Sequence, residues 1–482
     1  MKNLKLILTA LLSIVLLASC KKYLEVTPKT QMPQDLLFST EGGFKDALTG
    51  AYIQMNHKDA YGAALTQTTI EAITSSWDVT ANTSAQRMGL FTYTDQGVQD
   101  SLASIFAQQY KIISSVNAIL GQIDTKKNVF ATPGLYELIK GEALAIRAYC
   151  HLDILRLFGP IPTAPTVGNN LAYVTTLSKN INNRVAFTAF QTALLKDLAD
   201  AEALLKDTDP ITKYSIVQLK APSSSLALPD TYFGYRDIRM NYYAVKALQA
   251  RAQLWFNNPQ QAYLCAKEII DAKNTDGTNK FNLGGSADFA AGDFVLTKEH
   301  IFGLYDFNMF NKYTQRYANG TFRKGTTATT ITNQLYGNTG TDIRESSLWE
   351  LITLPNTSKA YIIKKYRTSD LQPTDNTKDY KQIPMLRLSE MYLIAAETAS
   401  YAEGVEYLRQ FRVARNVGQS SQPANTAALQ IEVLKEYRKE FYAEGQGFFA
   451  YKRVNAPKAS FLFVPSAATL NYLLPLPYME SI

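Results

Sequence analysis

The sequence predicts a mainly α-helical protein in which helical hairpins form a scaffold around one long irregular region. Three observations predict this fold. Apolar residues recur at spacings of three and four in many segments, as on one face of a helix. Short runs of asparagine, proline or glycine separate several of these segments into pairs, which is typical of helical hairpins. Two long stretches, about 59–100 and 275–382, lack this periodicity, but their aromatic content argues against disorder.

The N-terminus has the pattern of a secretory signal peptide. Lys2 and Lys5 accompany an apolar run at 4–18, which is shorter than the about 20 residues needed to span a bilayer. The run ends in Leu17-Ala18-Ser19-Cys20, which resembles a bacterial lipobox. We therefore expect removal of residues 1–19 and attachment of a diacylglycerol to the Cys20 thiol, which would tether residues 20–482 to a membrane. An ordinary signal peptide with an accidental cysteine is the alternative.

Apolar periodicity locates the helices of the scaffold. The first helix carries Phe44, Leu48, Ala51 and Met55, at spacings of 4, 3 and 4. Further segments with this pattern lie at 102–124, 139–157, 187–205, 242–256, 260–272, 385–400, 402–415 and 428–443. The predicted scaffold therefore occupies about 40–58, 102–272 and 383–445. We treat the mature chain as a single domain because no low-complexity linker interrupts it.

Two pairs of these helices are separated by short breakers. Asn257-Asn258-Pro259 lies between 242–256 and 260–272, and Ala402-Glu403-Gly404 separates the two later helices. These alanine-rich pairs resemble tetratricopeptide-type hairpins, although no clean fixed-period repeat is visible. Stacked hairpins form an elongated scaffold that can exceed the size of a single core.

Composition excludes several classes of function. The formal charge of +7 falls to +5 when the two signal-peptide lysines are removed (7 − 2), and the basic residues are scattered, which argues against nucleic-acid binding. No nucleophile elbow or phosphate-binding loop occurs, and His57, His151 and His300 lack metal-ligand spacing. We therefore predict no enzymatic activity, no cofactor and no metal. Asp288 and Asp293 leave a calcium site open.

The remaining cysteines and one carboxylate pair have structural interpretations. Cys150 and Cys265 lie on apolar helical stripes, so we expect two buried small side chains, while a bridge between them stays open. Glu390 and Glu397 are two helical turns apart. We expect them to pair with Arg387 or with neighbouring helices.

Capture of a neutral oligomer needs flat aromatic faces and a few polar groups, and three clusters qualify. The first comprises Trp77, Asp78, Asn82, Arg87, Phe91 and Tyr93. The second comprises Tyr305, Phe307, Asn308, Phe310, Asn311, Tyr313, Arg316 and Tyr317. The third comprises Trp349 with Asp342 and Arg344 upstream. The predicted ligand-binding residues are Trp77, Asn82, Arg87, Tyr93, Asn311, Tyr313, Arg316 and Trp349. Core packing is the alternative for each aromatic, and it is our interpretation of Trp255, which lies on a helical apolar stripe.

Six segments, taken in order, carry a recognisable pattern over nearly the whole mature chain. They are Cys20-Lys21-Lys22-Tyr23-Leu24-Glu25-Val26-Thr27-Pro28; Thr40 with Ala47-Leu48 and Gly50-Ala51-Tyr52; Gly141-Glu142-Ala143-Leu144-Ala145-Ile146-Arg147-Ala148-Tyr149 with Leu157-Phe158-Gly159-Pro160-Ile161-Pro162; Asn241-Tyr242-Tyr243-Ala244 with Ala250-Arg251-Ala252; Arg387-Leu388-Ser389-Glu390-Met391-Tyr392; and Glu436-Tyr437-Arg438-Lys439-Glu440-Phe441 with Glu444-Gly445 and Leu474-Pro475-Leu476-Pro477. Together they resemble the SusD/RagB family of nutrient-binding outer-membrane lipoproteins. The sequence departs from the family pattern at Tyr437, at Phe441 and at Gln446-Gly447, where an arginine is usual, and two lysines follow the lipobox in place of an acidic cluster.

The resemblance implies a helical-repeat scaffold that carries an irregular ligand-binding region at the outer surface of the outer membrane. It implies capture of oligosaccharides, or in some branches peptides, and their delivery to a partner TonB-dependent, SusC-like transporter without catalysis. Two alternatives stay open. A helical-repeat scaffold that binds only proteins would leave Trp77 and Trp349 dispensable, and a surface hydrolase would show turnover.

Overall fold

The computed structural model describes residues 33–223, 225–354, 356–371, 373–418 and 422–480. The predicted signal peptide, the predicted lipidation site at Cys20 and the first of the six family-like segments lie outside these ranges.

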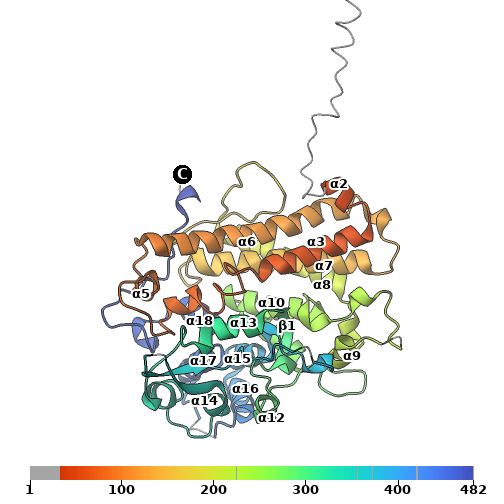
Figure 1. Cartoon of the computed structure of the whole chain (residues 1–482). Coiled ribbons are helices and arrows are strands. Elements are labelled where there is room, and N and C mark those ends of the chain that lie inside the picture. Colours follow the sequence, from red (N-terminus) through yellow and green to blue (C-terminus); the bar gives the residue numbers. More distant parts are fainter. Residues whose placement is uncertain (1–32, 224, 355, 372, 419–421, 481–482) are drawn as a thin grey trace, which may run out of the picture.

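An upper layer of long helices is built from the N-terminal half of the chain (Figure 1). It contains α3 (Glu41–Met55), α6 (Gln96–Ile123), α7 (Leu135–Phe158) and α8 (Phe187–Leu205), with the short α2 (Gln34–Leu37) at its edge. Successive helices pack together, α3 on α6, α6 on α7 and α7 on α8. Because α7 lies in the middle and is buried on almost every side, its polar side chains must find partners within the protein.

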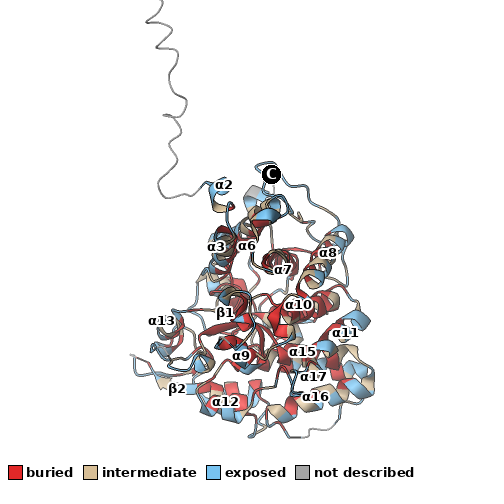
Figure 2. Ribbon diagram, turned by 90° about the vertical axis from the view of Figure 1, so that its right-hand side faces the viewer, coloured by how far each residue is buried: buried red, intermediate tan, exposed pale blue. Residues whose placement is uncertain are grey.

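A second group of helices comes from the C-terminal half and from the middle of the chain. It contains α10 (Tyr242–Trp255), α11 (Pro259–Ile270), α15 (Leu388–Thr398), α16 (Tyr401–Ala414), α17 (Thr426–Glu440) and α18 (Gln446–Arg453). α10 packs on α11, α11 on α15, and α15 on α16 and α17. Figure 2 shows buried residues along α7, α10, β1 and α15, between outer surfaces that are exposed.

Local sequence explains where several helices begin. The Thr40 side chain accepts a hydrogen bond from the Gly43 amide at 3.2 Å, and Asp95 caps α6 through the Val98 amide at 3.1 Å. Such caps satisfy amides that have no partner inside the helix. Pro259 occupies the first turn of α11, where its missing N–H costs nothing.

Two small antiparallel sheets interrupt the helices. β1 (His300–Tyr305) pairs with β4 (Gln382–Arg387), and β2 (Trp349–Thr353) pairs with β3 (Lys359–Ile363). The β1–β4 pair brings residues within the second irregular stretch against the strand that follows it, with Tyr305 opposite Gln382 and His300 opposite Arg387. Every residue of β4 is buried, so this sheet is part of the core.

Short elements fill the remainder of the described chain. The short α-helices are α4 (Thr69–Ile73), α5 (Ser84–Gly89), α9 (Ile216–Lys220), α12 (Ser286–Ala290), α13 (Met309–Tyr313) and α14 (Ile343–Leu348). π-helical turns lie at Thr314–Ala318 and Thr329–Leu335. Single 3-10 turns lie at Lys127–Val129, Pro210–Thr212, Thr231–Phe233, Arg236–Ile238, Thr297–Glu299, Asn376–Lys378, Lys458–Ser460 and Tyr478–Glu480.

The prediction of a mainly α-helical fold is confirmed. The predicted helix at 102–124 begins earlier, at Gln96, because Asp95 supplies a cap about two turns before the predicted start. Cys150 and Cys265 are both free and buried, and Trp255 is only 2% exposed, which agrees with their predicted core positions. The division of the chain into one mature domain stays a prediction.

Buried ion pairs hold the C-terminal helices together. Glu440 accepts hydrogen bonds from Arg387 at 2.8 Å, from Arg415 at 2.7 Å and from Arg344 at 3.1 Å. All four side chains are at most 3% exposed, so removing one partner would leave an uncompensated charge in the interior. This network includes residues of the fifth and sixth family-like segments.

The predicted structural roles of Glu390 and Glu397 are also confirmed, with partners on neighbouring helices. Glu390 pairs with Arg251 of α10 at 2.6 Å, and Glu397 pairs with Arg453 of α18 at 2.6 Å. Arg387 pairs instead with Glu299, Glu440 and Glu444. Among the described residues, no helix combines the length and apolar character that crossing a bilayer requires.

Candidate ligand-binding face

The two stretches predicted to be irregular lie side by side below α3. Asn56, at the end of α3, donates through Nδ2 to the Tyr305 carbonyl oxygen at 3.1 Å. Arg316 donates through Nη1 to the Gly62 carbonyl oxygen and to Gln67 Oε1, each at 2.9 Å. Residues 240 positions or more apart are therefore fixed against one another, and the first two predicted clusters adjoin.

One part of the second cluster stays at the surface, where the chain leaves β1. We call this surface the Phe307 face. It comprises Tyr305, Phe307, Asn308, Asn311 and Asp379, together with Lys381, whose side chain is only 2% exposed. The Phe307 ring is 65% exposed, which is unusual for an aromatic side chain in an ordered segment. Asn308 and Asn311 are exposed beside it in sequence and carry amide groups that can both donate and accept hydrogen bonds.

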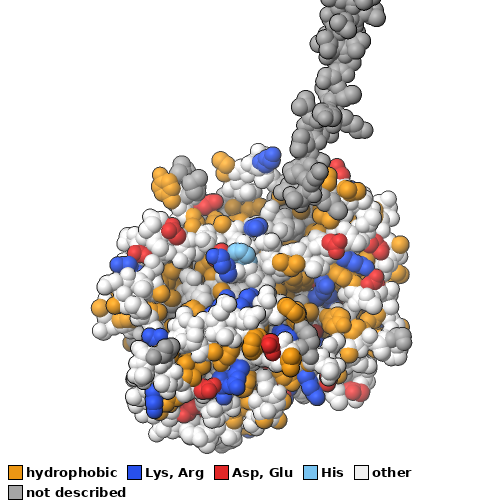
Figure 3. Space-filling model, in the orientation of Figure 1, with side chains coloured by type: hydrophobic (Ala, Val, Ile, Leu, Met, Phe, Trp, Pro, Cys, Tyr) orange, Lys and Arg blue, Asp and Glu red, His pale blue; other side chains and the backbone are white. Residues whose placement is uncertain are grey.

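Polar side chains frame this ring. The Tyr305 hydroxyl donates to Asp379 Oδ2 at 3.0 Å, and the Lys381 Nζ atom lies 5.8 Å from the centre of the Phe307 ring. Extension of the β1–β4 pairing fixes this arrangement, because the Asp306 amide donates to the Lys381 carbonyl oxygen at 2.8 Å. Figure 3 shows the side of the molecule that carries α3 and α13, where small groups of apolar side chains alternate with basic and acidic ones.

Trp77 does not lie at this surface. Its side chain is 3% exposed, and its Nε1 atom donates to the Gln67 carbonyl oxygen at 2.8 Å. The rings of Tyr317, Phe322 and Tyr442 surround it, with centroids 5.7, 5.6 and 5.2 Å away. The prediction that Trp77 contacts ligand is therefore wrong for this structure, because the packing of three other rings leaves no indole face for a sugar.

The third predicted cluster is also buried. Trp349 is 5% exposed, donates to the Tyr336 hydroxyl at 3.2 Å and packs on Tyr442 at 5.0 Å. Asp342 and Arg344 form a buried ion pair at 2.6 Å that belongs to the structural network around Glu440. The prediction of a ligand platform at Trp349 is therefore corrected: Trp349 begins β2, and its indole packs in the core.

The predicted residues of the first stretch hold the chain in place. Tyr93 is 8% exposed, and its hydroxyl donates to the Asn471 carbonyl oxygen at 2.7 Å, which ties the C-terminal segment to this region. The Arg87 Nη1 atom lies 3.1 Å from Asp95 Oδ2, the cap of α6. Asn82 is exposed. Tyr93 is therefore corrected to a packing residue, whereas Arg87 and Asn82 keep solvent-accessible groups.

The predicted residues of the second stretch divide between surface and core. Tyr313 is 7% exposed and stacks on Tyr317 with ring centroids 5.8 Å apart, so it is corrected to a core residue. Arg316 uses its guanidinium to join the two stretches and is only partly exposed. Asn311 is exposed and lies on α13, within the Phe307 face.

Sequence reasoning missed Asp379 and Lys381. They belong to the Phe307 face only because β1 and β4 pair across about 80 residues of intervening chain. The one signal in the sequence is the short apolar run at 301–305, which indicates a buried strand but does not identify its partner.

The two buried histidines have structural partners. His151 Nδ1 lies 2.9 Å from the Arg147 carbonyl oxygen, and its Nε2 accepts the Val174 amide at 2.9 Å. His300 Nδ1 lies 2.8 Å from Gln382 Oε1. Burial lowers the pKa of His151 to about 3 and that of His300 to about 4, so both rings are neutral at pH 7. A neutral ring that is fully buried cannot exchange protons with a surface ligand.

The other groups considered for metal or acid–base chemistry are also engaged. His57 lies 3.5 Å from Asp59 at the surface. Asp288 caps the first turn of α12, and Asp293 accepts hydrogen bonds from the Thr297 amide and hydroxyl at 2.6 and 2.8 Å. Within the described ranges, no group of three or more histidine, cysteine or acidic side chains is arranged to hold a metal ion.

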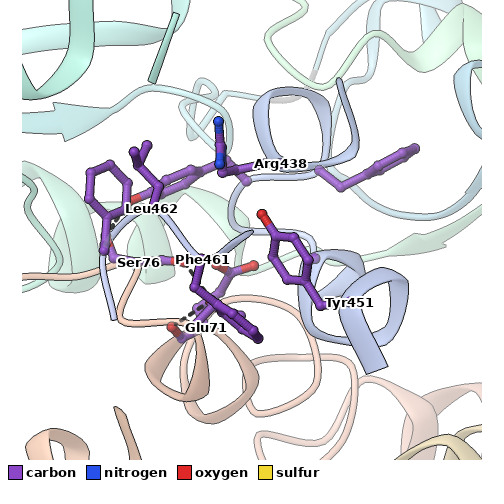
Figure 4. A pocket seen from close by; sticks show the side chains of 11 residues that line it. Glu71, Ser76, Arg438, Tyr451, Phe461 and Leu462 are labelled. Carbon is purple, nitrogen blue, oxygen red and sulfur yellow. Dashed lines mark hydrogen bonds between the residues drawn. The ribbon is translucent and has the colours of Figure 1, made fainter. Parts of the chain in front are cut away.

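A small cavity lies beside Tyr442, one of the rings that surround Trp77. Its volume is about 30 Å³, and Glu71, Ser76, Arg438, Tyr451, Phe461 and Leu462 contribute to its lining (Figure 4). Within the described chain, Arg438 Nε and the Tyr451 hydroxyl have no hydrogen-bond partner. A space of this size suits about one water molecule and is far below the roughly 300 Å³ that a ligand pocket needs. The cavity is therefore no sugar site.

Comparison with protein families matches almost the whole chain. A family described as "Starch-binding associating with outer membrane" (SusD-like) matches residues 22–252, and a second, described as "SusD family", matches residues 263–463. A curated relative, SusD-like protein P2 from Formosa agariphila, is 22% identical over 98% of this chain and 96% of its own length.

Solved structures share the fold. A SusD superfamily protein from Bacteroides thetaiotaomicron matches 92% of this chain and 97% of its own, with a TM-score of 0.68 at 20% identity. A protein described as a SusD-like carbohydrate binding protein from Bacteroides vulgatus matches 86% of this chain and 83% of its own, with a TM-score of 0.62 at 18% identity.

Proposed function

This chain belongs to the SusD/RagB family, and from that premise we propose that it captures oligosaccharides, or peptides, at the cell surface and delivers them to a TonB-dependent, SusC-like transporter. Proteins of this family are carbohydrate-binding proteins associated with the outer membrane. In this proposal Cys20 carries the lipid that anchors the chain, and the Phe307 face receives the ligand. The chain acts by binding and not by catalysis.

The exposed Phe307 ring is the observation that carries the choice of site. A sugar ring presents a flat apolar face of C–H groups, which packs on an aromatic ring, and hydroxyls at its edge, which need hydrogen-bond partners. Asn308, Asn311 and Asp379 offer such partners beside the ring. The Lys381 side chain is only 2% exposed and donates to the Leu371 carbonyl oxygen at 3.4 Å, so it supports the ring and is not counted as a ligand donor.

The expected affinity is weak. One aromatic platform contributes about 1 kcal/mol beyond burial, and each hydrogen bond adds a net of about 1 kcal/mol. A binding free energy summed from a few such contributions corresponds to a dissociation constant on the order of micromolar to millimolar. Weak capture fits a protein that must release its ligand to a transporter.

The arrangement of the described residues gives a hydrolase little support. Hydrolysis of a glycosidic bond needs two carboxyl groups that face one another across the substrate. At the Phe307 face, Asp379 accepts hydrogen bonds from the Tyr305 hydroxyl and the Lys381 amide, and Asp306 is salt-bridged to Lys312 at 2.6 Å. Asp306 is therefore a structural carboxylate, and Asp379 alone does not supply the pair of facing carboxyl groups that hydrolysis needs.

The test of ligand binding is a calorimetric titration of the purified protein with a panel of neutral oligosaccharides and short peptides. We expect saturable binding of at least one oligosaccharide, without product formation on prolonged incubation. In the Phe307→Ala variant the affinity should fall about fivefold to tenfold, as loss of one platform predicts. Tyr478→Ala is the matched control, because this ring is 77% exposed but lies elsewhere on the surface.

Each other outcome would overturn a defined part of the proposal. Unchanged binding by Phe307→Ala would move the site away from the Phe307 face. Products in the incubation would identify a hydrolase. If no saccharide or peptide binds while a stable protein complex forms, the chain is a protein-binding scaffold.

The proposed anchor is tested separately by metabolic labelling with a radiolabelled fatty acid. We expect label on the chain and its recovery with outer membranes, and loss of both in Cys20→Ala. An unlabelled wild-type chain in the soluble fraction would overturn the anchor but would leave ligand binding intact.

A further inference from the structure

One surface loop carries two apolar side chains that are more than half exposed to solvent. Residues 175–184 are all exposed, and among them Leu177 is 53% and Ile181 is 96% exposed. The same ten residues include Lys179 and Arg184 but no aspartate or glutamate. Exposed aliphatic side chains gain by leaving water, and the positive charges beside them complement an anionic surface, so the loop has the character of a contact surface.

The base of this loop is firmly held. The Tyr110 hydroxyl donates to the Ala172 carbonyl oxygen at 3.0 Å, and Asn117 donates to the Val174 carbonyl oxygen at 3.0 Å. Arg147, which is buried, donates to the Thr175 carbonyl oxygen at 3.1 Å. The loop therefore projects from a fixed point on the upper helical layer, and its exposure is a feature of the fold.

The loop projects at the end of the molecule where α2 also lies. Figures 1 and 2 both show α2, the loop that follows α7 and the end of the described chain at this end, beyond α6. Arg184 lies 3.9 Å from Glu480, which confirms that the loop and the C-terminal segment adjoin. Two further apolar side chains are exposed here, Leu36 of α2 at 59% and Tyr478 at 77%.

The position of α2 sets which end of the molecule is close to the bilayer. The described chain begins at Pro33, which is 13 Cα–Cα steps (33 − 20) from Cys20. Even fully extended, that length of chain spans at most about 45 Å. A lipid on Cys20 would therefore keep the α2 end, rather than α16 on the opposite side of the molecule, near the membrane (Figure 1).

We propose that the loop at 175–184 rests on the lipid surface, with Leu177 and Ile181 inserted at the boundary between headgroups and acyl chains and with Lys179 and Arg184 against lipid phosphates. This inference rests on the proposed anchor at Cys20. Burial of the two aliphatic side chains removes apolar area from water. The loop itself contains no acidic residue that an anionic surface would repel, and Glu480 lies beside Arg184 outside it. Two contacts, the anchor and the loop, would then restrict the tilt of the molecule.

The test places a reporter on the loop of the full-length lipidated protein. A single Ile181→Cys substitution is labelled with a polarity-sensitive dye, and the native Cys150 and Cys265 are buried and so protected from labelling. The protein is reconstituted into vesicles of phosphatidylethanolamine and phosphatidylglycerol. We expect a blue shift of the dye on reconstitution and quenching by nitroxide-labelled lipid. Val413→Cys on α16, 56% exposed in the wild type, is the matched control and should show neither effect.

Flotation of the same samples separates the two proposals. If the protein floats with the vesicles but the dye at position 181 stays in water, the loop contact is wrong and the anchor stands. If the protein does not float, both are overturned. If the dye is shielded only when a transporter is reconstituted alongside, the loop binds protein and not lipid. Thermal unfolding of Ile181→Cys should match the wild type, since this side chain packs on nothing.

Discussion

Arg251 donates to both carboxylate oxygens of Glu390, from Nε at 2.7 Å and from Nη2 at 2.6 Å. Each side chain is 4% exposed. The same guanidinium also donates to the Tyr149 hydroxyl at 3.0 Å and to the Met385 carbonyl oxygen at 2.8 Å. One arginine of α10 thereby joins α7, β4 and α15, which belong to segments up to about 240 residues apart.

Replacement of Arg251 by methionine should lower the free energy of unfolding by about 3–5 kcal/mol, because the Glu390 charge would stay buried without a partner. The double variant Arg251→Met/Glu390→Met should lose less than the sum of the two single variants, since no isolated charge remains. Urea denaturation measures both effects. Arg409→Met is the control, because the Arg409–Glu406 pair is exposed and its loss should leave the stability almost unchanged. Additive losses would show that the pair is not coupled.

The fold was predictable because the residues that carry the family resemblance hold the core together. Arg251 and Glu390 come from the fourth and fifth family-like segments, and Glu440 comes from the sixth. Their pairing is a property of the scaffold, so their presence indicates the architecture whatever the ligand. Apolar spacing located the helices for the same reason, since a buried face leaves a period of 3.6 residues in the sequence.

The binding face was not predictable in the same way. Trp77 and Phe307 both lie outside clear helices and near polar residues, so the sequence gives no reason to separate them. Their exposures, 3% and 65%, are decided by Tyr317, Phe322 and Tyr442, which reach Trp77 from distant parts of the chain. Burial of an irregular segment depends on such long-range packing, which local periodicity does not record.

Substitution of these two aromatic residues should therefore have opposite effects. Trp77→Ala should cost about 3–5 kcal/mol of stability, because it leaves a cavity among three rings. Phe307→Ala should change stability by less than about 0.5 kcal/mol, as for an exposed side chain. Thermal and urea unfolding distinguish the two. A stable Trp77→Ala protein that no longer binds saccharide would instead return Trp77 to the binding site.

Gly445 is a position where an added methyl group has no space. Its φ is +75°, and a Cβ atom would lie 2.1 Å from the Leu65 carbonyl oxygen. Gly445 lies in the connection from α17 to α18, where the backbone passes close to Leu65. Its amide donates to Glu71 at 3.0 Å. Gly445→Ala should therefore destabilise the protein by at least about 2 kcal/mol, because the backbone at residue 445 would be strained and the backbone at Leu65 would have to move.

Gly447, two residues later, is the matched control. A Cβ atom at Gly447 meets nothing within 4 Å, and the residue lies in the first turn of α18. Gly447→Ala should leave stability unchanged or raise it by roughly 0.5 kcal/mol, because alanine favours the helix. Equal unfolding midpoints for the two variants would contradict the close approach at Gly445.

Glu71 should make stability depend on pH near neutrality. Its carboxyl group is 5% exposed, and burial raises its pKa from 4.5 to about 7, although the hydrogen bonds of Ser76 and the Gly445 amide and the charge of Lys365 act in the opposite direction. The folded state therefore holds a proton that the unfolded chain releases between pH 4.5 and 7. The stability linked to this proton is fully present below pH 4.5 and is lost as the pH rises through 7, in total roughly 3 kcal/mol.

Glu71→Gln isolates this contribution, because glutamine mimics the protonated acid and still accepts the Gly445 amide. The variant and the wild type should be about equally stable at pH 4.5, and the variant should become the more stable of the two as the pH rises to 8. The quantity to compare is the difference in the free energy of unfolding between the variant and the wild type at each pH. The free energy itself also depends on His151 and His300, whose lowered pKa values reduce stability as the pH falls below 6.5. This difference removes their contribution, which is common to both proteins. Urea denaturation at several pH values gives that difference, and parallel curves would show that Glu71 keeps the same protonation state in the folded and unfolded chain.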